Sequence, residues 1–426
     1  MKKNVLILLR RESVLPEPSS GILSLLLTDG RLTELSVWPA ESEQAAAPLN
    51  SIYVGKVMNV AKNINAAFVE LTKGQRAFLP LSHAENACIL NRKADGRILA
   101  GDELLVQVER EAVKTKEPVL TMEISIAGRY AVVFPGKDSG RLQFSGKLSD
   151  EERLSIARAC SEAGITEEIL ASCSLIVRTN AAELSDCRYA PLISEAKALL
   201  AQASALWQTA GTRTCYSCLY RPESGFLTAV RDTPQEQYEE ILTDDRQLYG
   251  QLHVWLERSY PEVLGRLRLY EDISLSLPSL YGLSKKLREA LEKRVWLKSG
   301  GYLVIEPTEA LTVIDVNSGK YTGKKGMRDT FRLINREAAL EIARQLRLRN
   351  LSGIILVDFI SMDKKEDERE LLHLLSAELK KDPVRAAVVD MTALGLVELT
   401  RKKVRRSLYE QLKGAAAEAG SQENTP

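Results

Sequence analysis

The chain has 426 residues, of which 45% are hydrophobic and 27% are charged, and its formal net charge is +1. This length suggests about three domains, and the composition is that of an ordinary soluble protein with a large core. The near-neutral charge excludes a surface that attracts polyanions everywhere. Six scattered cysteines exclude a disulfide framework and suit a reducing cytosol.

The N-terminal segment predicts a buried strand and not an export signal. Its apolar run, Val5 to Leu9, is followed at once by Arg10 and Arg11. Such a run is too short for a signal peptide or a membrane span. We therefore expect a cytoplasmic protein without a membrane span. Its first strands are predicted over residues 5–9, 21–27 and 32–38.

Residues 51–127 alternate between short apolar strands and turns that are rich in Gly, Asn and Lys. About five strands in roughly 80 residues predict a small β-barrel of the OB type. Such barrels bind single-stranded RNA by stacking bases on exposed aromatic rings beside cationic side chains. The candidates are Phe68, Phe78 and Lys116, although an alternating Phe is more often part of a core.

Residues 128–297 mix helices and strands. The pattern predicts helices near residues 149–164, 192–210 and 283–297. It predicts strands over residues 129–135, 173–181, 215–220 and 225–232.

Cys215 and Cys218 form one CxxC pair in this region. A structural metal site needs two further ligands of comparable spacing. The chain offers only three histidines, His83, His253 and His373. We therefore interpret the cysteine pair as structural, with a metal or redox role as the less favoured alternative.

The last third of the chain contains a strand, a long helix and a second strand. Helical spacing spans residues 328–350, between apolar runs that lead to Asp315 and Asp358. Such a crossover makes parallel neighbours, so both carboxylates should lie at one edge of a sheet, where ligands bind. The apolar run around Asp315 predicts a buried strand, in which an unpaired acid would cost several kcal/mol.

Two neighbouring carboxylates repel each other unless a cation or a proton lies between them. Hard oxygen ligands at a polar sheet edge suit Mg²⁺, and Asn317 points to the same face as Asp315. Together these residues favour metal-assisted phosphodiester hydrolysis. On spacing alone, the alternative that each acid is a cap or an ion-pair partner stays open. A P-loop is excluded, because Lys325 stands where Ser or Thr must bind magnesium.

Basic residues cluster late in the chain although the net charge is near zero. The clusters are residues 319–328, 344–349 and 401–406. Local clusters of this kind can track a phosphate backbone. The plainer interpretation is a run of solvated charges.

Several motifs together resemble the ribonuclease E/G family. "GGYLVIEPTEALTVIDVNSG", "EIARQLRLRNLSGIILVDFISM" and "GLVELTRKK" resemble its catalytic domain. "IYVGKVMNVAKNINAAFVEL" with "FLPL" resembles its OB-fold RNA-binding domain, and "LIVRT" resembles the segment that reads a 5′-monophosphate. The similarity runs in order from about residue 1 to residue 408.

The resemblance implies an α/β multidomain fold. An RNase H-like domain is interrupted by an OB-fold barrel and a 5′-end sensor region, and a DNase I-like α/β catalytic domain follows. The implied parts are 1–46 (RNase H-like, first part), 47–127 (OB fold), 128–211 (sensor), 212–290 (RNase H-like, second part), 291–408 (catalytic) and 409–426 (flexible tail).

The resemblance also implies a role for individual residues. The implied groups are Asp315 and Asp358 as ligands of the catalytic Mg²⁺, with Asn317 assisting; Arg178 and Thr179 around the 5′-phosphate, with Val132 packing nearby; and Phe68, Phe78 and Lys116 along the RNA strand.

The sequence departs from the family's pattern in three places. No cysteine follows Cys218, so the CPxC zinc motif after "GLVE" is missing and zinc is not expected. The usual "SRR" stretch is replaced by Ser145, Gly146 and Lys147, and "KEPVLT" replaces a Gly after Lys116. We expect a monomer, or a homodimer without a zinc link, and no long degradosome scaffold.

The leading hypothesis is a magnesium-dependent endoribonuclease that cleaves single-stranded, AU-rich RNA and leaves 5′-phosphate and 3′-hydroxyl ends, in RNA processing and decay. The alternative is a non-cleaving RNA-binding factor in ribosomal RNA maturation. A ribonuclease that uses two imidazoles is disfavoured, because the three histidines fall in none of the motifs.

Overall fold

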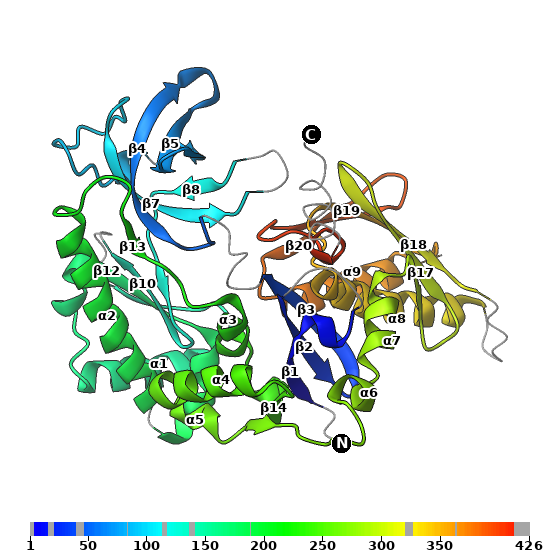
Figure 1. Cartoon of the computed structure of the whole chain (residues 1–426). Coiled ribbons are helices and arrows are strands. Elements are labelled where there is room, and N and C mark those ends of the chain that lie inside the picture. Colours follow the sequence, from blue (N-terminus) through cyan, green and yellow to red (C-terminus); the bar gives the residue numbers. More distant parts are fainter. Residues whose placement is uncertain are drawn as a thin grey trace, which may run out of the picture. The chain divides into compact units, whose positions relative to one another are not determined.

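The computed structural model describes residues 4–15, 21–39, 47–82, 84–112, 117–135, 141–187, 189–319, 327–362 and 364–412 (Figure 1). The chain divides into two compact units. The first contains residues 1–40, 238–250 and 266–426, and the second contains residues 41–237 and 251–265. In the described part of the chain, no helix is long and apolar enough to cross a membrane.

The second unit begins with a closed barrel, as the alternating pattern predicts. Its strands are β4 (Ile52–Ala61), β5 (Ala66–Thr72), β6 (Gln75–Pro80), β7 (Glu103–Arg110) and β8 (Val119–Thr121). They pair in the order β4-β5-β6-β8-β7, and β7 closes back onto β4. Apolar residues at every second position fill the interior, among them Val69, Leu79 and Val106. A short strand, β13 (Cys218–Tyr220), pairs with the start of β4.

A four-stranded sheet follows the barrel in the same unit. Its order is β11 (Leu142–Phe144), β12 (Cys173–Val177), β10 (Ala131–Pro135), β9 (Ile126–Ala127). Helix α1 (Asp150–Glu162) begins at a capping box between Ser149 and Glu152. Helix α2 (Ala190–Ala210) packs against β10, and the 3-10 segment η6 (Thr179–Cys187) lies between β12 and α2.

The strand predicted over residues 225–232 is wrong, because these residues form helix α3 (Gly225–Asp232). Its buried apolar residues, Phe226 and Val230, are four positions apart and therefore share one helical face. The unit also contains the end of α4 (Arg246–Ser259) and the short helix α5 (Pro261–Leu264).

The first unit contains two sheets. The first has the order β15 (Leu267–Leu269), β14 (Glu240–Thr243), β1 (Val5–Arg10), β2 (Gly21–Thr28), β3 (Arg31–Pro39). Strand β1 is buried, as its apolar run predicts, and helices α6 (Leu277–Tyr281) and α7 (Leu283–Leu291) pack on the same core. The helix predicted over residues 283–297 therefore ends at Leu291 and gives way to a strand.

The second sheet of this unit carries the candidate active site. Its order is β16 (Arg294–Trp296), β17 (Tyr302–Pro307), β18 (Leu311–Asn317), β19 (Gly353–Asp358), β21 (Val397–Arg401), β20 (Ala386–Met391). Helices α8 (Met327–Leu348) and α9 (Lys365–Leu379) cover one face of it. The residues on the other face, which we call the open face, point away from these helices. The structure describes the tail predicted for residues 409–426 only as far as residue 412.

Candidate active site and RNA-contacting surfaces

The crossover β18–α8–β19 brings the two candidate acids side by side. β18 and β19 are parallel neighbours, and Asp315 lies directly opposite Asp358 in their register. Alternation along each strand sends Ile314 and Val357 into the core under α8 and α9, so the acids emerge on the open face. The prediction that both carboxylates lie at one sheet edge is therefore confirmed.

The predicted burial of Asp315 is wrong. Both Asp315 and Asp358 are exposed, so neither carboxylate pays the cost of desolvation. The run that precedes Asp315 has apolar residues on both faces of the strand, and Val313 is 38% exposed on the same open face. The acids are therefore accessible to a ligand from solvent.

Asn317 lies beside Asp315 on the open face and its amide contacts that carboxylate. Asn317 Nδ2 donates a hydrogen bond of 2.6 Å to Asp315 Oδ2. This bond holds one carboxylate oxygen and leaves the amide oxygen of Asn317 as a further acceptor. The contact restrains the orientation of the Asp315 carboxylate.

The donor set of this edge fits a magnesium ion. Opposite residues on neighbouring strands are roughly 5 Å apart, a separation that one ion can bridge. Among the residues that the structure describes, no group of three or more His, Cys, Asp and Glu side chains could enclose a metal. Mg²⁺ needs no such cage, because it keeps several waters and is usually held by one or two carboxylates.

The barrel presents Phe68 and Phe78 on its outer surface. The two residues are opposite each other on β5 and β6, and their ring centroids are 6.0 Å apart in an edge-to-face arrangement. Their neighbours Ala67, Val69 and Ala77 fill the barrel interior. The interpretation of these phenylalanines as core residues is therefore wrong, and their half-exposed rings can accept a base.

Arg76 joins this aromatic pair and was missed by the sequence analysis. Its guanidinium carbon lies 4.5 Å from the centroid of the Phe68 ring, and its Nε donates to Glu117 Oε1 at 2.7 Å. The available signal was its place two residues before Phe78, on the same face of β6. Lys116 lies outside the described residues.

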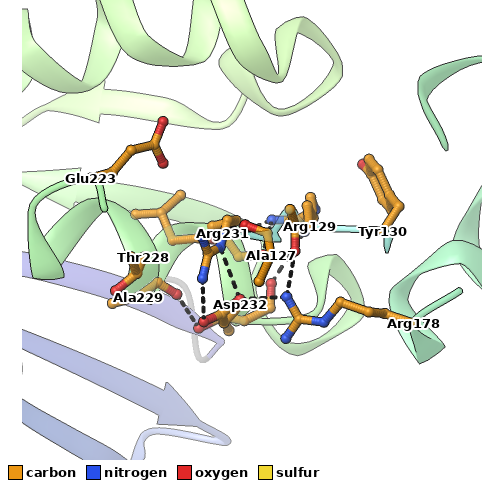
Figure 2. A network of polar contacts seen from close by, with 12 residues as sticks. Ala127, Arg129, Tyr130, Arg178, Glu223, Thr228, Ala229, Arg231 and Asp232 are labelled. Carbon is orange, nitrogen blue, oxygen red and sulfur yellow. Dashed lines mark hydrogen bonds and ion pairs between the residues drawn. The ribbon is translucent and has the colours of Figure 1, made fainter. Parts of the chain in front are cut away.

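Arg178 is held at the end of β12 by two acceptors. Figure 2 shows its side chain reaching Asp232, with Arg231 on the other side of that carboxylate. Arg178 Nη1 donates to Asp232 Oδ1 at 2.7 Å and to the carbonyl oxygen of Gly128 at 2.5 Å. Burial opposes the ionisation of Asp232, but the charges of Arg231 and Arg178 outweigh it and lower the pKa of Asp232.

A buried polar side chain holds one of the segments around Arg178 in place. Arg129 is fully buried, and its guanidinium donates to the carbonyl oxygens of Val230, Arg231 and Thr233 at the end of α3. It thereby fixes the segment that carries Asp232.

Glu195 on α2 holds the segment that supplies the other acceptor of Arg178. Its carboxylate accepts hydrogen bonds from the backbone N–H groups of Arg129, Tyr130 and Ala131. A Cβ at Gly128 would lie 2.3 Å from the carboxyl carbon of Glu195, so a larger residue there would displace this carboxylate from its backbone donors.

Thr179 and Val132 lie near Arg178 along the chain and across the sheet. Thr179 is exposed, and its hydroxyl is 2.9 Å from the hydroxyl of Ser145. Val132 pairs with Ile176, two residues before Arg178. The segment that replaces the family's "SRR" stretch therefore borders Thr179.

Comparisons with known proteins bear on this geometry. The model of the ribonuclease E/G family matches residues 125–404, and that of the S1 RNA binding domain matches residues 47–123, which include the barrel. The chain belongs to the ribonuclease E/G family. Both the resemblance and the expectation of an OB-type RNA-binding barrel are confirmed.

Individual family members are similar over most of this chain. Ribonuclease E of Synechocystis sp. is 36% identical over 382 residues, which are 87% of this chain and 55% of that protein. Ribonuclease G of Escherichia coli (strain K12) is 34% identical over 398 residues, 90% of this chain and 78% of that protein. Ribonuclease E of Haemophilus influenzae is 30% identical, and the match spans 41% of that protein.

Within this ribonuclease E/G chain, several arginines of two basic clusters have structural partners. Arg401 is 3% exposed and donates from Nε to Asp382 Oδ2 at 2.8 Å. Arg405 stacks 3.9 Å from the centroid of Trp38, and Arg344 pairs with Glu341. The suggestion that residues 401–406 contact RNA phosphates is therefore wrong for Arg401. In the third cluster, at residues 319–328, residues 320–326 lie outside the described part of the chain.

Cys215 and Cys218 lie at the barrel's edge strand. Cys215 is half-buried and Cys218 is exposed at the start of β13. Burial raises the pKa of the Cys215 thiol, which favours the protonated form that does not bind metals. His83 lies outside the described residues, and His253 and His373 are far along the chain from this pair.

Proposed function

We propose that this chain is a magnesium-dependent endoribonuclease that cleaves single-stranded RNA internally and leaves 5′-phosphate and 3′-hydroxyl ends, in RNA processing and decay. The observation that carries the proposal is the pairing of Asp315 with Asp358 on neighbouring parallel strands, with Asn317 bonded to Asp315. It occurs in a ribonuclease E/G chain that also has an S1 domain.

In this proposal Asp315 and Asp358 hold the metal. A bound Mg²⁺ would lower the pKa of a water and neutralise charge on the phosphate. Asn317 orients Asp315 through its amide hydrogen bond. Because both acids are exposed on the open face, a phosphodiester can approach them without rearrangement of the core.

The remaining residues bind and orient the RNA. Phe68 and Phe78, with Arg76 over the first ring, offer stacking and a positive charge to an unpaired base. Both hydrogen bonds of Arg178 use Nη1, which leaves Nη2 and Nε free of side-chain or backbone acceptors among the described residues. Those two donors have the fork geometry that grips a terminal phosphate.

We further propose that the sheet β15-β14-β1-β2-β3 belongs to the RNase H-like scaffold and the sheet β16-β17-β18-β19-β21-β20 to the DNase I-like catalytic domain. Strands β1 to β3 come before the barrel in the chain, whereas β14 and β15 come after the four-stranded sheet β11-β12-β10-β9. This order supports a scaffold domain that the other two interrupt. We further propose a cytoplasmic location, in line with membership of the ribonuclease E/G family.

One cleavage experiment tests the proposal. A single-stranded, AU-rich RNA with a 5′-monophosphate is incubated with the full chain and Mg²⁺, with EDTA, and with EDTA followed by excess Mg²⁺. We expect internal cleavage that EDTA stops and Mg²⁺ restores. The downstream product should be a substrate for 5′-phosphate-dependent ligation, and the upstream product for 3′-hydroxyl extension. RNA binding without cleavage under all three conditions would instead support the non-cleaving RNA-binding factor.

A further inference from the structure

Three side chains on strands β16 and β17 form an exposed aromatic and cationic group beside the candidate metal site. We call Arg294, Trp296 and Tyr302 the Trp296 cluster. The rings of Trp296 and Tyr302 are 5.3 Å apart at an angle of 58°. The guanidinium carbon of Arg294 lies 4.5 Å from the Tyr302 centroid and 5.8 Å from the Trp296 centroid.

The strand register places this cluster on the same face as the acids. Trp296 is opposite Tyr302, and Tyr302 is opposite Asn317. In the next row, Arg294, Val304, Asp315 and Asp358 follow one another across four strands. Residues directly opposite each other point to the same side of a sheet. The cluster therefore lies two strands from Asp315, a distance of roughly 10 Å.

Core packing does not account for the aromatic residues of the cluster. The buried positions of these strands are filled by Val295, Leu297 and Leu303, which belong to the core under α8 and α9. Trp296 alternates with them, points the other way and is 60% exposed. An exposed tryptophan that contacts a tyrosine and an arginine has the composition of a site that stacks an unpaired base.

We propose that the Trp296 cluster binds a base of the RNA strand next to the bond that is cut. The proposal rests on the proposed function, because the strand must bring its scissile phosphate to Asp315 and Asp358. A distance of roughly 10 Å corresponds to about three stacked nucleotides, and to fewer where the strand is extended. Arg294 adds a positive charge in the same cross-strand row as the acids, two strands from Asp315, where it can contact a backbone phosphate.

This arrangement determines which nucleotides matter for cleavage. Stacking accepts every base, so the cluster contributes a requirement for an unpaired base at one position and little preference for its identity. A paired nucleotide cannot enter, because its ring is already stacked and bonded in a duplex. The cluster thus gives the catalytic sheet its own contribution to single-strand specificity, separate from that of the barrel.

The test removes either the RNA base or the aromatic ring of Trp296. A series of RNAs carries a single abasic nucleotide at successive positions around the cut, and each is cleaved by the wild type, Trp296→Ala, Trp296→Phe and Trp207→Ala. Trp207 is a matched control, because it is an exposed tryptophan on α2 in the other unit. Phe68→Ala is the second control, because it weakens stacking at the barrel.

We expect one abasic position at which wild-type cleavage slows about tenfold or more, the scale of one lost stacking contact. At that position Trp296→Ala should show no further loss, while it cleaves the intact RNA about tenfold more slowly than the wild type. Trp296→Phe should restore most of the rate, and both control variants should keep the abasic effect. An equal penalty from the abasic nucleotide in Trp296→Ala and in the wild type would overturn the proposal.

A measurement of RNA affinity tests this proposal independently of the proposed function. The affinity of the intact and the abasic RNA is measured in EDTA, where no cleavage occurs. A lower affinity of Trp296→Ala for the intact RNA alone would support the cluster even if the wild type does not cleave with Mg²⁺. Unchanged affinity and unchanged cleavage in Trp296→Ala would overturn it while the proposed function stands.

Discussion

At the scale of single residues, Arg178 shows how a side chain that we propose to bind a phosphate is held in place. Asp232 and the carbonyl of Gly128 occupy Nη1, and Arg129 and Glu195 fix the two segments that supply these acceptors. The depressed pKa of Asp232 keeps this carboxylate charged near neutral pH, so the arginine stays oriented. A phosphate bound there, as we propose, would meet donors that need little reorganisation.

We predict that Arg178→Ala slows cleavage of 5′-monophosphate RNA about tenfold more than cleavage of 5′-hydroxyl RNA, because one charge-assisted contact is lost only in the first substrate. The measurement is kcat/KM for the two substrates with the same sequence. Arg213→Ala is the matched control, since Arg213 is exposed in the same unit. Equal slowing of both substrates would mean that Arg178 does not sense the 5′ end of the RNA.

The residue patterns predicted some of these side chains and missed others for definite reasons. Asp315, Asn317 and Asp358 stand out because polar residues at the end of apolar strands are conspicuous. Arg129 and Glu195 could not be found, because their partners are backbone groups far along the chain, such as Val230 for Arg129. Arg401 looked like part of a basic surface, since the sequence does not show that Asp382 meets it in the core.

At the scale of elements, the sheet of the candidate active site depends on one buried ion pair. Asp382 follows α9, and Arg401 ends β21, so their contact ties the helix layer to the strand beside β19. Arg401 Nη1 also donates to Asn350 Oδ1 at 2.8 Å and to the carbonyl oxygen of Leu351. The segment that leads into β19 is thereby joined to the same pair.

We predict that Asp382→Asn destabilises this unit by about 3–5 kcal/mol, because it leaves the charge of Arg401 buried without its partner. Urea unfolding of the full chain, with hydrogen exchange read in β19 and β21, measures the effect. Asp390→Asn, an exposed acid on β20, should change stability by less than about 0.5 kcal/mol. Similar small effects for both variants would show that the pair does not stabilise the sheet.

The barrel contains a buried ion pair whose contribution to stability should depend on pH. Asp102 is 3% exposed, and Arg92 binds both its oxygens at 2.7 and 2.8 Å. Burial opposes the ionisation of Asp102, but its hydrogen bonds from Arg92 and from Leu99 N–H lower its pKa below the usual value. The folded form therefore binds this proton less readily than the unfolded chain.

We predict that the contribution of Asp102 to stability is complete above about pH 4, its ordinary pKa, and is lost as the pH falls through the lower folded pKa. Asp102→Asn should therefore weaken the amide protection of β4 and β7 at pH 7. The difference from the wild type should shrink toward pH 3. A difference that stays constant from pH 7 to pH 3 would contradict the ion pair assigned to Asp102 and Arg92.

Helices and strands were predicted correctly where one hydrophobic periodicity dominates. The prediction failed where the sequence fits both the helical and the strand periodicity. The barrel strands and the β18–α8–β19 crossover have clear alternation or helical spacing. Residues 225–232 fit both patterns, and packing of Phe226 and Val230 selects the helix. Leu311 and Val313 are apolar although they lie on the open face. The residue pattern therefore wrongly predicted that Asp315 is buried.

At the scale of the whole molecule, each unit brings together segments that are distant in the chain. Strand β1 pairs in parallel with β14, with Val5 opposite Glu240. Residue patterns cannot reveal such a pairing, because each strand alone is only a short apolar run; the resemblance to the family was the sole indication of an interrupted domain. The barrel and the four-stranded sheet β11-β12-β10-β9, by contrast, are each contiguous in sequence and are visible as local patterns.

We predict that the purified protein contains no stoichiometric zinc and is a monomer or a homodimer held by ordinary surface contacts. No cysteine follows Cys218 in this sequence, and a structural zinc site needs four ligands, usually thiolates or imidazoles. Elemental analysis of protein purified without chelator, together with its mass in solution, checks this. About half a zinc per chain, lost together with dimerisation in Cys215→Ser, would show that Cys215 and Cys218 form a link elsewhere.

The central claim is that Asp315 and Asp358 form the metal site of a ribonuclease. The most direct measurement compares RNA cleavage with Mg²⁺ and RNA affinity for Asp315→Asn, Asp358→Asn and the control Asp390→Asn. Both site variants should lose cleavage, since the metal they hold contributes several kcal/mol to the transition state. Their RNA affinity should stay within a few-fold of the wild type, because the barrel supplies most of it. Wild-type turnover in either site variant would contradict the account.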